Sequence, residues 1–151
     1  MVSASGVEEM NQVAIDLAKR WEGYRQEVYL CPAGIPTSGY GHAWQGGSKP
    51  RPLPPDEAEE MLALDLLVAQ DALYRLSPCM VLESEERQGA LIDFIFNLGS
   101  GNYQASTLRR KINAGEWEAA QYQIRRWVYA AGIKLKGLML RREAEAAYLS
   151  V

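Results

Sequence analysis

Residues 21–42 read WEGYRQEVYLCPAGIPTSGYGH, and this segment joins the end of a predicted helix to a predicted hairpin. Apolar residues precede it at alternating steps of three and four, which is one face of an α-helix, and Gly23 is a natural stop directly after Glu22. That apolar face comprises Val7, Met10, Ala14, Leu17 and Trp21. Glu22 is therefore expected in the last turn of the helix.

The expected position of Glu22 favours a carboxyl group that keeps its proton. The negative end of the helix dipole opposes ionisation there, and the neighbouring Trp21 and Tyr24 lower the hydration of the group. A carboxyl that is protonated near neutral pH is what a general acid needs.

Two segments after the helix predict a β-hairpin or short meander. Residues 28–31 and 37–42 are rich in β-formers, and Pro32-Ala33-Gly34-Ile35-Pro36 separates them as a turn. Cys31 and Thr37 would flank that turn. If the hairpin folds back over the helix end, the side chains of Glu22, Cys31 and Thr37 converge, which is typical of a bond-cleaving cleft.

The rest of the chain predicts helices. Gly and Pro crowd residues 46–55, and helical spacing follows from Asp56 to about Leu76, a length of about 30 Å that could join two lobes. Beyond Pro78 the chain is predicted to be all helical. Four helices are expected there. The first is capped by Ser84 and ends at Gly99, and the second is capped by Ser106 and ends at Gly115. The third runs from Trp117 to Tyr129 and the fourth from Leu138 to Leu149.

Composition sets limits on the class of protein. The 151 residues are 48% hydrophobic, which is enough for a sizeable core, and no apolar run approaches the roughly 20 residues of a membrane span. Met1–Gly6 shows no signal peptide or anchor pattern. Two cysteines are too few for a disulfide scaffold, so both are expected to be reduced, with Cys79 a buried or half-buried packing residue.

Charge is unevenly distributed along the chain. The net charge is −3, but residues 103–151 hold nine basic and four acidic residues. Such a basic region could attract an anionic polymer such as a cell wall or nucleic acid, or it could consist of solvated helix faces. The overall acidity argues against strong steering by bulk charge.

The order Glu22, eight residues, Cys31, five residues, Thr37 resembles the catalytic signature of phage-type lysozymes, glycoside hydrolase family 24, in the variant with Cys at the second place. Later landmarks of the same family follow in order, so that the resemblance covers roughly residues 10–149. They are Phe96-Asn97-Leu98-Gly99, Ser106-Thr107-Leu108, Asn113-Ala114-Gly115, Arg126-Trp127, Gly137-Leu138, Arg141-Arg142 and Glu145.

The resemblance implies an α+β, mostly α, lysozyme-like bilobal fold. Residues 1–151 would form a single catalytic domain with an N-terminal lobe at about 1–55, a connecting helix at about 56–77 and a helical C-terminal lobe at about 78–151. The expected activity is that of an endolysin, which cleaves the β-1,4 bond between N-acetylmuramic acid and N-acetylglucosamine in peptidoglycan.

The resemblance also implies roles for individual residues. Glu22 would be the general acid, Cys31 the base or nucleophile, and Thr37 the residue that positions water. A water between acid and base needs carboxyl-to-base separations of about 6.5–9.5 Å, whereas direct attack by Cys31 needs a shorter gap. Cys31 in place of Asp removes a permanent negative charge, and the thiol needs a lowered pKa to act as base or nucleophile.

Further expected contacts with the glycan are Phe96, Asn97, Thr107 and His42, although the register at Thr107 can shift by one. His42 is the only histidine and has no partners at ligand spacing, so no zinc site is expected, and its alternative is a structural hydrogen bond. No metal or organic cofactor is implied.

Two other classes of function remain open at this point. A lytic transglycosylase would form 1,6-anhydro products without water, and a non-catalytic wall-binding module would keep the groove but lose the chemistry. In every case the expected partner is the peptidoglycan strand rather than nucleic acid. The protein would be a monomer that is made in the bacterial cytoplasm and acts on the wall. No stable membrane anchor is expected in this sequence, so the protein would depend on a holin to cross the inner membrane, unless an anchor segment is missing from the sequence.

Overall fold

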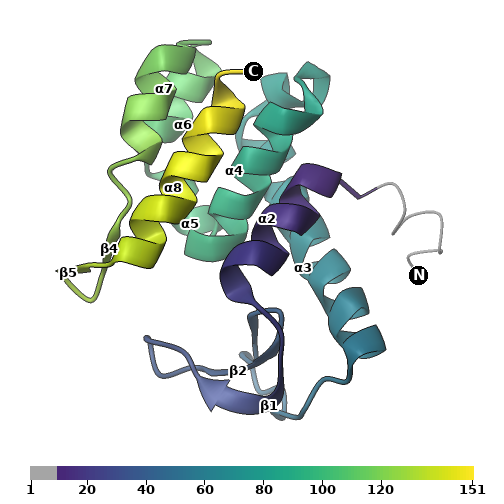
Figure 1. The fold of residues 1–151 in the computed structure, drawn as a ribbon. Helices are drawn as coiled ribbons and strands as arrows, with labels where there is room; N and C mark the ends of the chain where they lie inside the picture. The colour runs from purple at the N-terminus through teal and green to yellow at the C-terminus, as the bar shows by residue number, and fades with distance from the viewer. Residues whose placement is uncertain (1–9) are drawn as a thin grey trace.

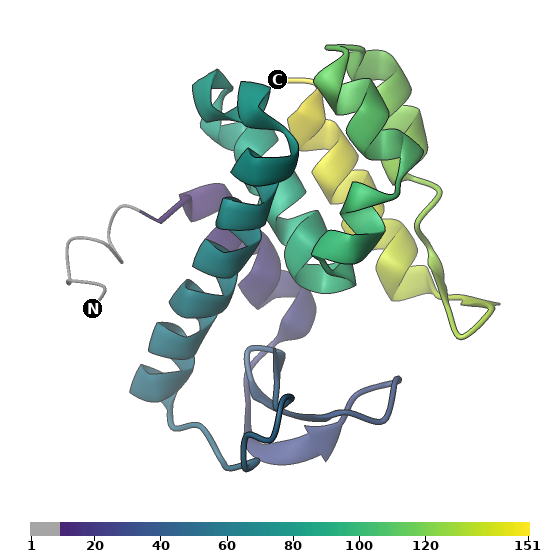
Figure 2. The same cartoon turned by 180° about the vertical axis from the view of Figure 1, so that it is seen from behind.

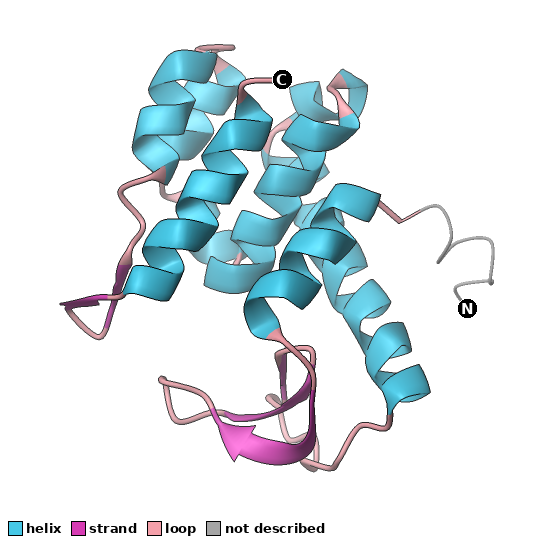
Figure 3. Cartoon of the chain, in the orientation of Figure 1, coloured by secondary structure: helices cyan, strands magenta, loops and turns pink. Residues whose placement is uncertain are grey.

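The computed structural model describes residues 10–151; the expectations for Met1–Gly6 and for Val7 lie outside this range. The described chain is mostly helical, with seven α-helices and two small antiparallel sheets (Figure 3). Figure 1 shows the three-stranded sheet at one end of the molecule and most of the helices gathered at the other. The expected α+β, mostly α, class is confirmed.

Helix α2 (Gln12–Glu22) forms as its sequence predicts. The Asn11 side chain accepts a hydrogen bond from the backbone N–H of Ala14 and so caps the helix, and Gly23 ends it with a φ of 70°. Ala14, Leu17 and Ala18 form the buried face. Glu22 is the last helical residue, as expected.

The predicted hairpin is present as part of a three-stranded sheet. Its strands β1 (Arg25–Leu30), β2 (Pro36–Gly39) and β3 (His42–Ala43) pair antiparallel in that order, with Tyr29 opposite Thr37. The connecting turn is closed by the Gly34 N–H donating to the Cys31 carbonyl at 2.8 Å. Cys31 and Thr37 therefore flank the turn.

Helix α3 (Pro55–Leu76) connects the sheet to the other helices, as Figure 2 shows. It begins at Pro55, directly after Pro54, and proline is tolerated at the first position of a helix. One side of α3 is buried along its length, from Ala58 near the sheet to Leu76 near the following helices. The long helix predicted at 56–76 is confirmed.

The remaining helices follow α3 in the chain. They are the 3₁₀ helix η1 (Pro78–Leu82), α4 (Glu85–Leu98), α5 (Ser100–Gln104), α6 (Thr107–Asn113), α7 (Trp117–Ile124) and α8 (Lys136–Leu149). Every residue of α4 from Gly89 to Ile95 is buried, and α4 packs against α2, α3 and α8. A helix that is buried on all sides forms the centre of a core. The predicted caps Ser84 and Ser106 accept hydrogen bonds from Arg87 and Arg109.

The prediction that the chain is all helical beyond Pro78 is wrong at one place. Helix α7 ends at Ile124 rather than Tyr129, and strands β4 (Tyr129–Ala130) and β5 (Ile133–Lys134) form a hairpin. Ala131 and Gly132 make its turn with φ values of 51° and 79°, and positive φ at both central residues is the backbone of a tight hairpin turn. Aromatic and β-branched residues on either side favour strands over helix.

Both cysteines are free thiols, as expected, but the burial predicted for Cys79 is wrong because its side chain is exposed. It lies in the short 3₁₀ helix η1, where Met80 rather than Cys79 faces the core. Burial at such a turn depends on its orientation, which the apolar character of one side chain does not fix.

The close approach of α2 and α4 gives a test of the packing. A Cβ atom at Gly89 would lie 2.5 Å from Cβ of Val13 and 2.6 Å from Oδ1 of the capping Asn11. Gly89→Ala is therefore expected to reduce the free energy of unfolding by about 1–3 kcal/mol, as overpacked cores do. Urea unfolding followed by circular dichroism measures this change.

Gly101→Ala is the matched control, because Gly101 is also helical but a Cβ atom there meets nothing within 4 Å. This variant is expected to be neutral or slightly stabilised. Equal stability of the two variants would show that α2 and α4 are not in close contact at Gly89.

Candidate active site

The structure brings Glu22, Cys31 and Thr37 to one cleft with a volume of about 830 Å³. Phe96 and Asn97, at the end of α4, line the same cleft. The opposite rim includes residues of the β4–β5 hairpin and the start of α8, namely Tyr129, Ala130, Ala131, Leu135 and Leu138. The cleft has apolar walls with few polar groups. Its volume suits a ligand larger than a small-molecule fragment.

Glu22 projects from the end of α2 and pairs with Arg141 of α8. Its Oε2 accepts a hydrogen bond from Arg141 Nη1, and its side chain stays 20% exposed while that of Arg141 is 4% exposed. The same carboxyl is packed against Gly41, where a Cβ atom would lie 2.9 Å from Cδ of Glu22. Glu22 is therefore held on two sides and open to the cleft on a third.

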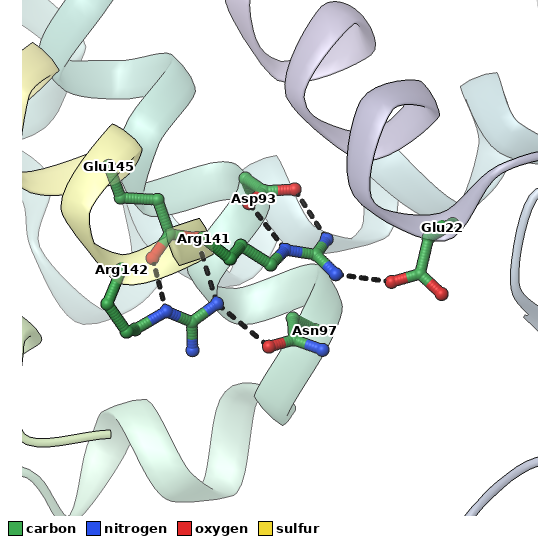
Figure 4. A network of polar contacts seen from close by, with 6 residues as sticks. All are labelled: Glu22, Asp93, Asn97, Arg141, Arg142 and Glu145. Carbon is green, nitrogen blue, oxygen red and sulfur yellow. Dashed lines mark hydrogen bonds and ion pairs between the residues drawn. The ribbon is translucent and has the colours of Figure 1, made fainter. Parts of the chain in front are cut away.

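Arg141 is shared between two carboxylates. Its Nε and Nη2 donate to Oδ2 and Oδ1 of Asp93 at 2.9 and 2.7 Å, a two-bond pairing with a side chain that is fully buried (Figure 4). Arg141 lowers the pKa of Asp93 although burial alone would raise it. The guanidinium is thus fixed by Asp93 and presents its remaining nitrogen to Glu22.

The sequence predicted the helix end, Trp21 and Tyr24 as the surroundings of Glu22, and the structure adds the guanidinium of Arg141. Sequence reasoning missed Arg141 as part of the site because it lies 119 positions away in the chain. The available signal was a pair of adjacent arginines, Arg141-Arg142, on the helix predicted at the end of the chain.

The second arginine extends the network. Arg142 is fully buried, and its Nη2 donates to Oδ1 of Asn97 at 2.8 Å and to Oε2 of Glu145 at 3.1 Å (Figure 4). Its Nε lies 2.7 Å from Glu145 Oε1, yet the angles there do not make a hydrogen bond, so the contact is an ion pair only. Burial and the nearby Asp93 raise the pKa of Glu145 well above its ordinary value.

Cys31 sits at the start of the β1–β2 turn and is partly exposed to the cleft. Burial raises the pKa of its thiol, but hydrogen bonds from the backbone of Ile35, Ala33 and Gly34 and from the Thr37 side chain outweigh this and hold the pKa below its ordinary value of 9.0. The turn thus favours the thiolate, which is the reactive form of cysteine.

Thr37 lies beside Cys31 and is 3% exposed. Its hydroxyl donates to the Ile35 carbonyl at 2.8 Å, and because it carries one proton it donates either there or to the thiolate. In both cases its oxygen lone pairs remain free to accept a hydrogen bond from a molecule in the cleft.

His42 lines a neighbouring pocket of about 310 Å³ that shares Gly41 and Phe96 with the cleft. Its Nδ1 lies 2.8 Å from Oδ2 of Asp65 on α3, and its ring meets Trp44 edge to face. The structural hydrogen bond that was the alternative for His42 is therefore present, at the side of the cleft rather than among Glu22, Cys31 and Thr37.

Thr107 is not among the residues that line the cleft. It faces another pocket, of about 640 Å³, together with Gln123, Arg126 and Trp127, and its hydroxyl accepts a hydrogen bond from Arg110 at 2.9 Å. Tyr129 lines both this pocket and the cleft.

Within residues 10–151, His, Cys, Asp and Glu nowhere gather in a group of three that could hold a metal ion. In the same part of the chain, no helix combines the length and the apolar character needed to cross a membrane.

The matches of this chain to known proteins agree with one another. The family model for phage lysozyme matches residues 19–145. A SAR-endolysin of bacteriophage PS119 is 38% identical over 125 residues, which are 82% of this chain and 73% of that protein.

Solved structures agree in fold. The endolysin from Escherichia coli O157:H7 phage FAHEc1 superposes with a TM-score of 0.80 at 27% identity and covers 95% of each chain. The muramidase domain of SpmX from Asticaccaulis excentricus gives a TM-score of 0.76 at 27% identity, with 100% of this chain and 98% of that chain covered.

The contact between Gly41 and Glu22 can be tested by stability. Gly41→Ala introduces strain at a φ of 72° and also displaces the Glu22 carboxyl, which a Cβ atom at this position would overlap. Gly46→Ala introduces the same strain at a φ of 68° with nothing within 4 Å. We expect Gly41→Ala to be less stable than Gly46→Ala by about 1–3 kcal/mol, the cost of overpacking, in parallel thermal or urea unfolding. Equal losses would mean that Glu22 is not held between Gly41 and Arg141.

Proposed function

The chain belongs to the phage lysozyme family, and we propose that it cleaves the β-1,4 bond between N-acetylmuramic acid and N-acetylglucosamine with Glu22 as its acid. As a member of that family it is a glycoside hydrolase that degrades peptidoglycan for cell lysis. The alternatives, a lytic transglycosylase and a wall-binding module, are not favoured by these relatives.

The observation that carries the catalytic proposal is the pairing of Glu22 with a guanidinium fixed by Asp93. Glu22 protonates the glycosidic oxygen as the bond to the leaving sugar breaks, and it is then a carboxylate. Arg141 stabilises that carboxylate more than the acid before it. Because this interaction strengthens as the proton leaves Glu22, it lowers the barrier rather than only binding the substrate.

Cys31 supplies the second group on the far side of the scissile bond. As a thiolate it either removes a proton from the attacking water or attacks the sugar carbon itself, and the two routes need different distances from Glu22. Thr37 accepts a hydrogen bond from the attacking water and holds it beside Cys31. These two residues come from opposite ends of one turn, so their separation is short and fixed.

The remaining site residues contact the glycan in this proposal. Phe96 and Asn97 bind the sugars from α4, His42 contributes from the adjoining pocket, and Thr107 contributes from the pocket that reaches the cleft through Tyr129. Residues 1–151 act as one catalytic domain, with an N-terminal lobe at about 1–55, the connecting helix and a C-terminal lobe. The proposed reaction uses these side chains and water.

The proposal also covers where the protein is made and where it acts. The protein is a monomer that is made in the cytoplasm of a bacterial host and acts on the cell wall. Its access to the wall depends on a holin or on release from an anchor.

Glu22→Gln tests the acid role. Gln keeps an oxygen for Arg141 but cannot donate a proton to the leaving oxygen, so hydrolysis of purified peptidoglycan should fall by about 10²–10⁴-fold while the circular dichroism spectrum is unchanged. Mass spectrometry of the soluble products should show reducing-end muramic acid from the wild type.

Glu27→Gln, at an exposed residue of β1, is the charge-matched control and should keep full activity. Retained hydrolysis in Glu22→Gln would reject the assignment, and 1,6-anhydro ends would indicate a transglycosylase.

Cys31→Asp tests the thiolate role through the pH profile. The rate should rise as pH passes through the pKa of Cys31, because the thiolate forms there, and that pKa lies below 9.0. Asp has an ordinary pKa of about 3.9, so Cys31→Asp should extend activity to lower pH, whereas Cys31→Ala should lose about a hundredfold. Cys79→Ala, at an exposed thiol, should leave the profile unchanged. An unshifted acidic limb in Cys31→Asp would exclude Cys31 as the titrating group.

A further inference from the structure

The amide of Asn97 has a fixed direction in the cleft. Asn97 is the penultimate residue of α4 and lines the cleft, and its Oδ1 accepts a hydrogen bond from Arg142 Nη2 at 2.8 Å. Figure 4 shows the amide nitrogen on the side turned away from Arg142, toward the side on which Glu22 lies.

The orientation of the Asn97 amide follows from its partner, even though the oxygen and nitrogen of an amide look alike in a structure. A guanidinium has only donors, so the atom of Asn97 that faces Arg142 must be the acceptor oxygen. The other end of the amide is then NH₂, which can only donate. Arg142 therefore decides the hydrogen-bonding polarity that Asn97 presents.

Arg142 cannot easily turn to another partner. It is fully buried, its guanidinium lies 5.1 Å from the centre of the Phe94 ring, and Glu145 holds its Nε side. Its Nη1 already lacks a partner, so the oxygen of Asn97 is one of the few acceptors available to it. A buried donor without an acceptor is costly, and this keeps the pair together.

Much of the wall of the cleft that holds Asn97 is apolar. Phe96 and Leu98 flank it in sequence, and Ala130, Leu135 and Leu138 line the same cleft. An acetamido group combines a carbonyl acceptor with a methyl group, so it matches a fixed donor beside apolar walls. A sugar hydroxyl can donate or accept, so a fixed donor does little to select it.

We propose that Asn97 donates its amide N–H to an acetamido carbonyl of the glycan, and that Arg142 is the positioning residue that fixes this donor toward the cleft. The inference rests on the proposed function, because it concerns the same cleft. It assigns to Asn97 a selectivity for N-acetylated over de-N-acetylated strands, which general contact with sugars would not give.

The test compares kcat/KM on N-acetylated peptidoglycan with that on the same material after chemical de-N-acetylation of its glucosamine residues. The wild type is expected to prefer the acetylated strands by about tenfold or more, the effect of a lost hydrogen bond at a buried group. Asn97→Ala should lose most of this preference. Asn97→Asp still pairs with Arg142 but offers a carboxylate, so it should favour the glucosamine ammonium and reverse the preference.

Arg142 is tested through the same ratio. Arg142→Met removes the donors that hold Oδ1, frees the amide to turn, and should reduce the preference for acetylated strands although Asn97 is still present. Arg142→Lys keeps one donor nitrogen and should keep part of the preference for acetylated strands. A merely structural role for Arg142 would lower activity on both substrates equally, and thermal unfolding of each variant separates that case from loss of the fold.

The outcomes separate this inference from the proposed function. If the wild type cleaves both substrates equally, or if Asn97→Ala keeps the wild-type ratio, the assignment of Asn97 is overturned while a loss of activity in Glu22→Gln still supports the muramidase. If the wild type releases no muramic acid ends from acetylated strands, the proposed function itself fails.

Discussion

The two-bond pairing of Arg141 with Asp93 is the interaction on which the site depends. Asp93 lies in the buried run of α4, and Arg141 reaches it from α8, so the pair joins two central helices. The same guanidinium then binds Glu22 at the end of α2. Removing one partner of a buried pair typically costs about 3–5 kcal/mol, because the other charge is left unpaired in the interior. The position of the acid is thus tied to the stability of the core.

The buried carboxyls around this pair respond to pH in opposite directions. Arg141 holds the pKa of Asp93 below its ordinary value of 3.8, so the stability that Asp93 contributes is present above that value and is lost as pH falls through the lowered pKa. Burial and Asp93 raise the pKa of Glu145 well above 4.5, so the fold favours its neutral form and that contribution is lost as pH rises through the raised pKa. Arg141 pairs with Asp93 and Glu22, and Arg142 lies against Glu145 and Asn97, so each of the two guanidiniums faces side-chain oxygens.

The parts of the site that sequence could predict are those set by neighbours in the chain. Glu22 at the end of a helix, and Cys31 and Thr37 on either side of a Pro/Gly turn, follow from local periodicity and turn chemistry, and the structure brings the three together. Arg141 escaped prediction because its partners are set by helix packing across the whole domain. The β4–β5 hairpin escaped because a turn with positive φ at Ala131 has no marker at that residue, only Gly132 beside it. Thr107 was placed by motif order, and order along the chain does not fix which pocket the first residue of a helix faces.

The adjacent arginines of α8 bind two residues on one face of α4, because Asp93 and Asn97 are about one helical turn apart. Successive residues on an α-helix point about 100° apart, so Arg141 and Arg142 diverge although they are neighbours in sequence. One reaches Asp93 and Glu22 and the other reaches Asn97. The acid and the amide donor therefore share a rigid support on buried helices, whereas Cys31 and Thr37 are held by a turn of the small sheet. Since catalysis needs the acid and the second group at a set distance across the sugar, the geometry between them depends on how the sheet sits against α3, which packs against both β2 and α4. A small shift of that helix would therefore change both the separation of Glu22 and Cys31 and the contact of Glu22 with Gly41, which lies between β2 and β3.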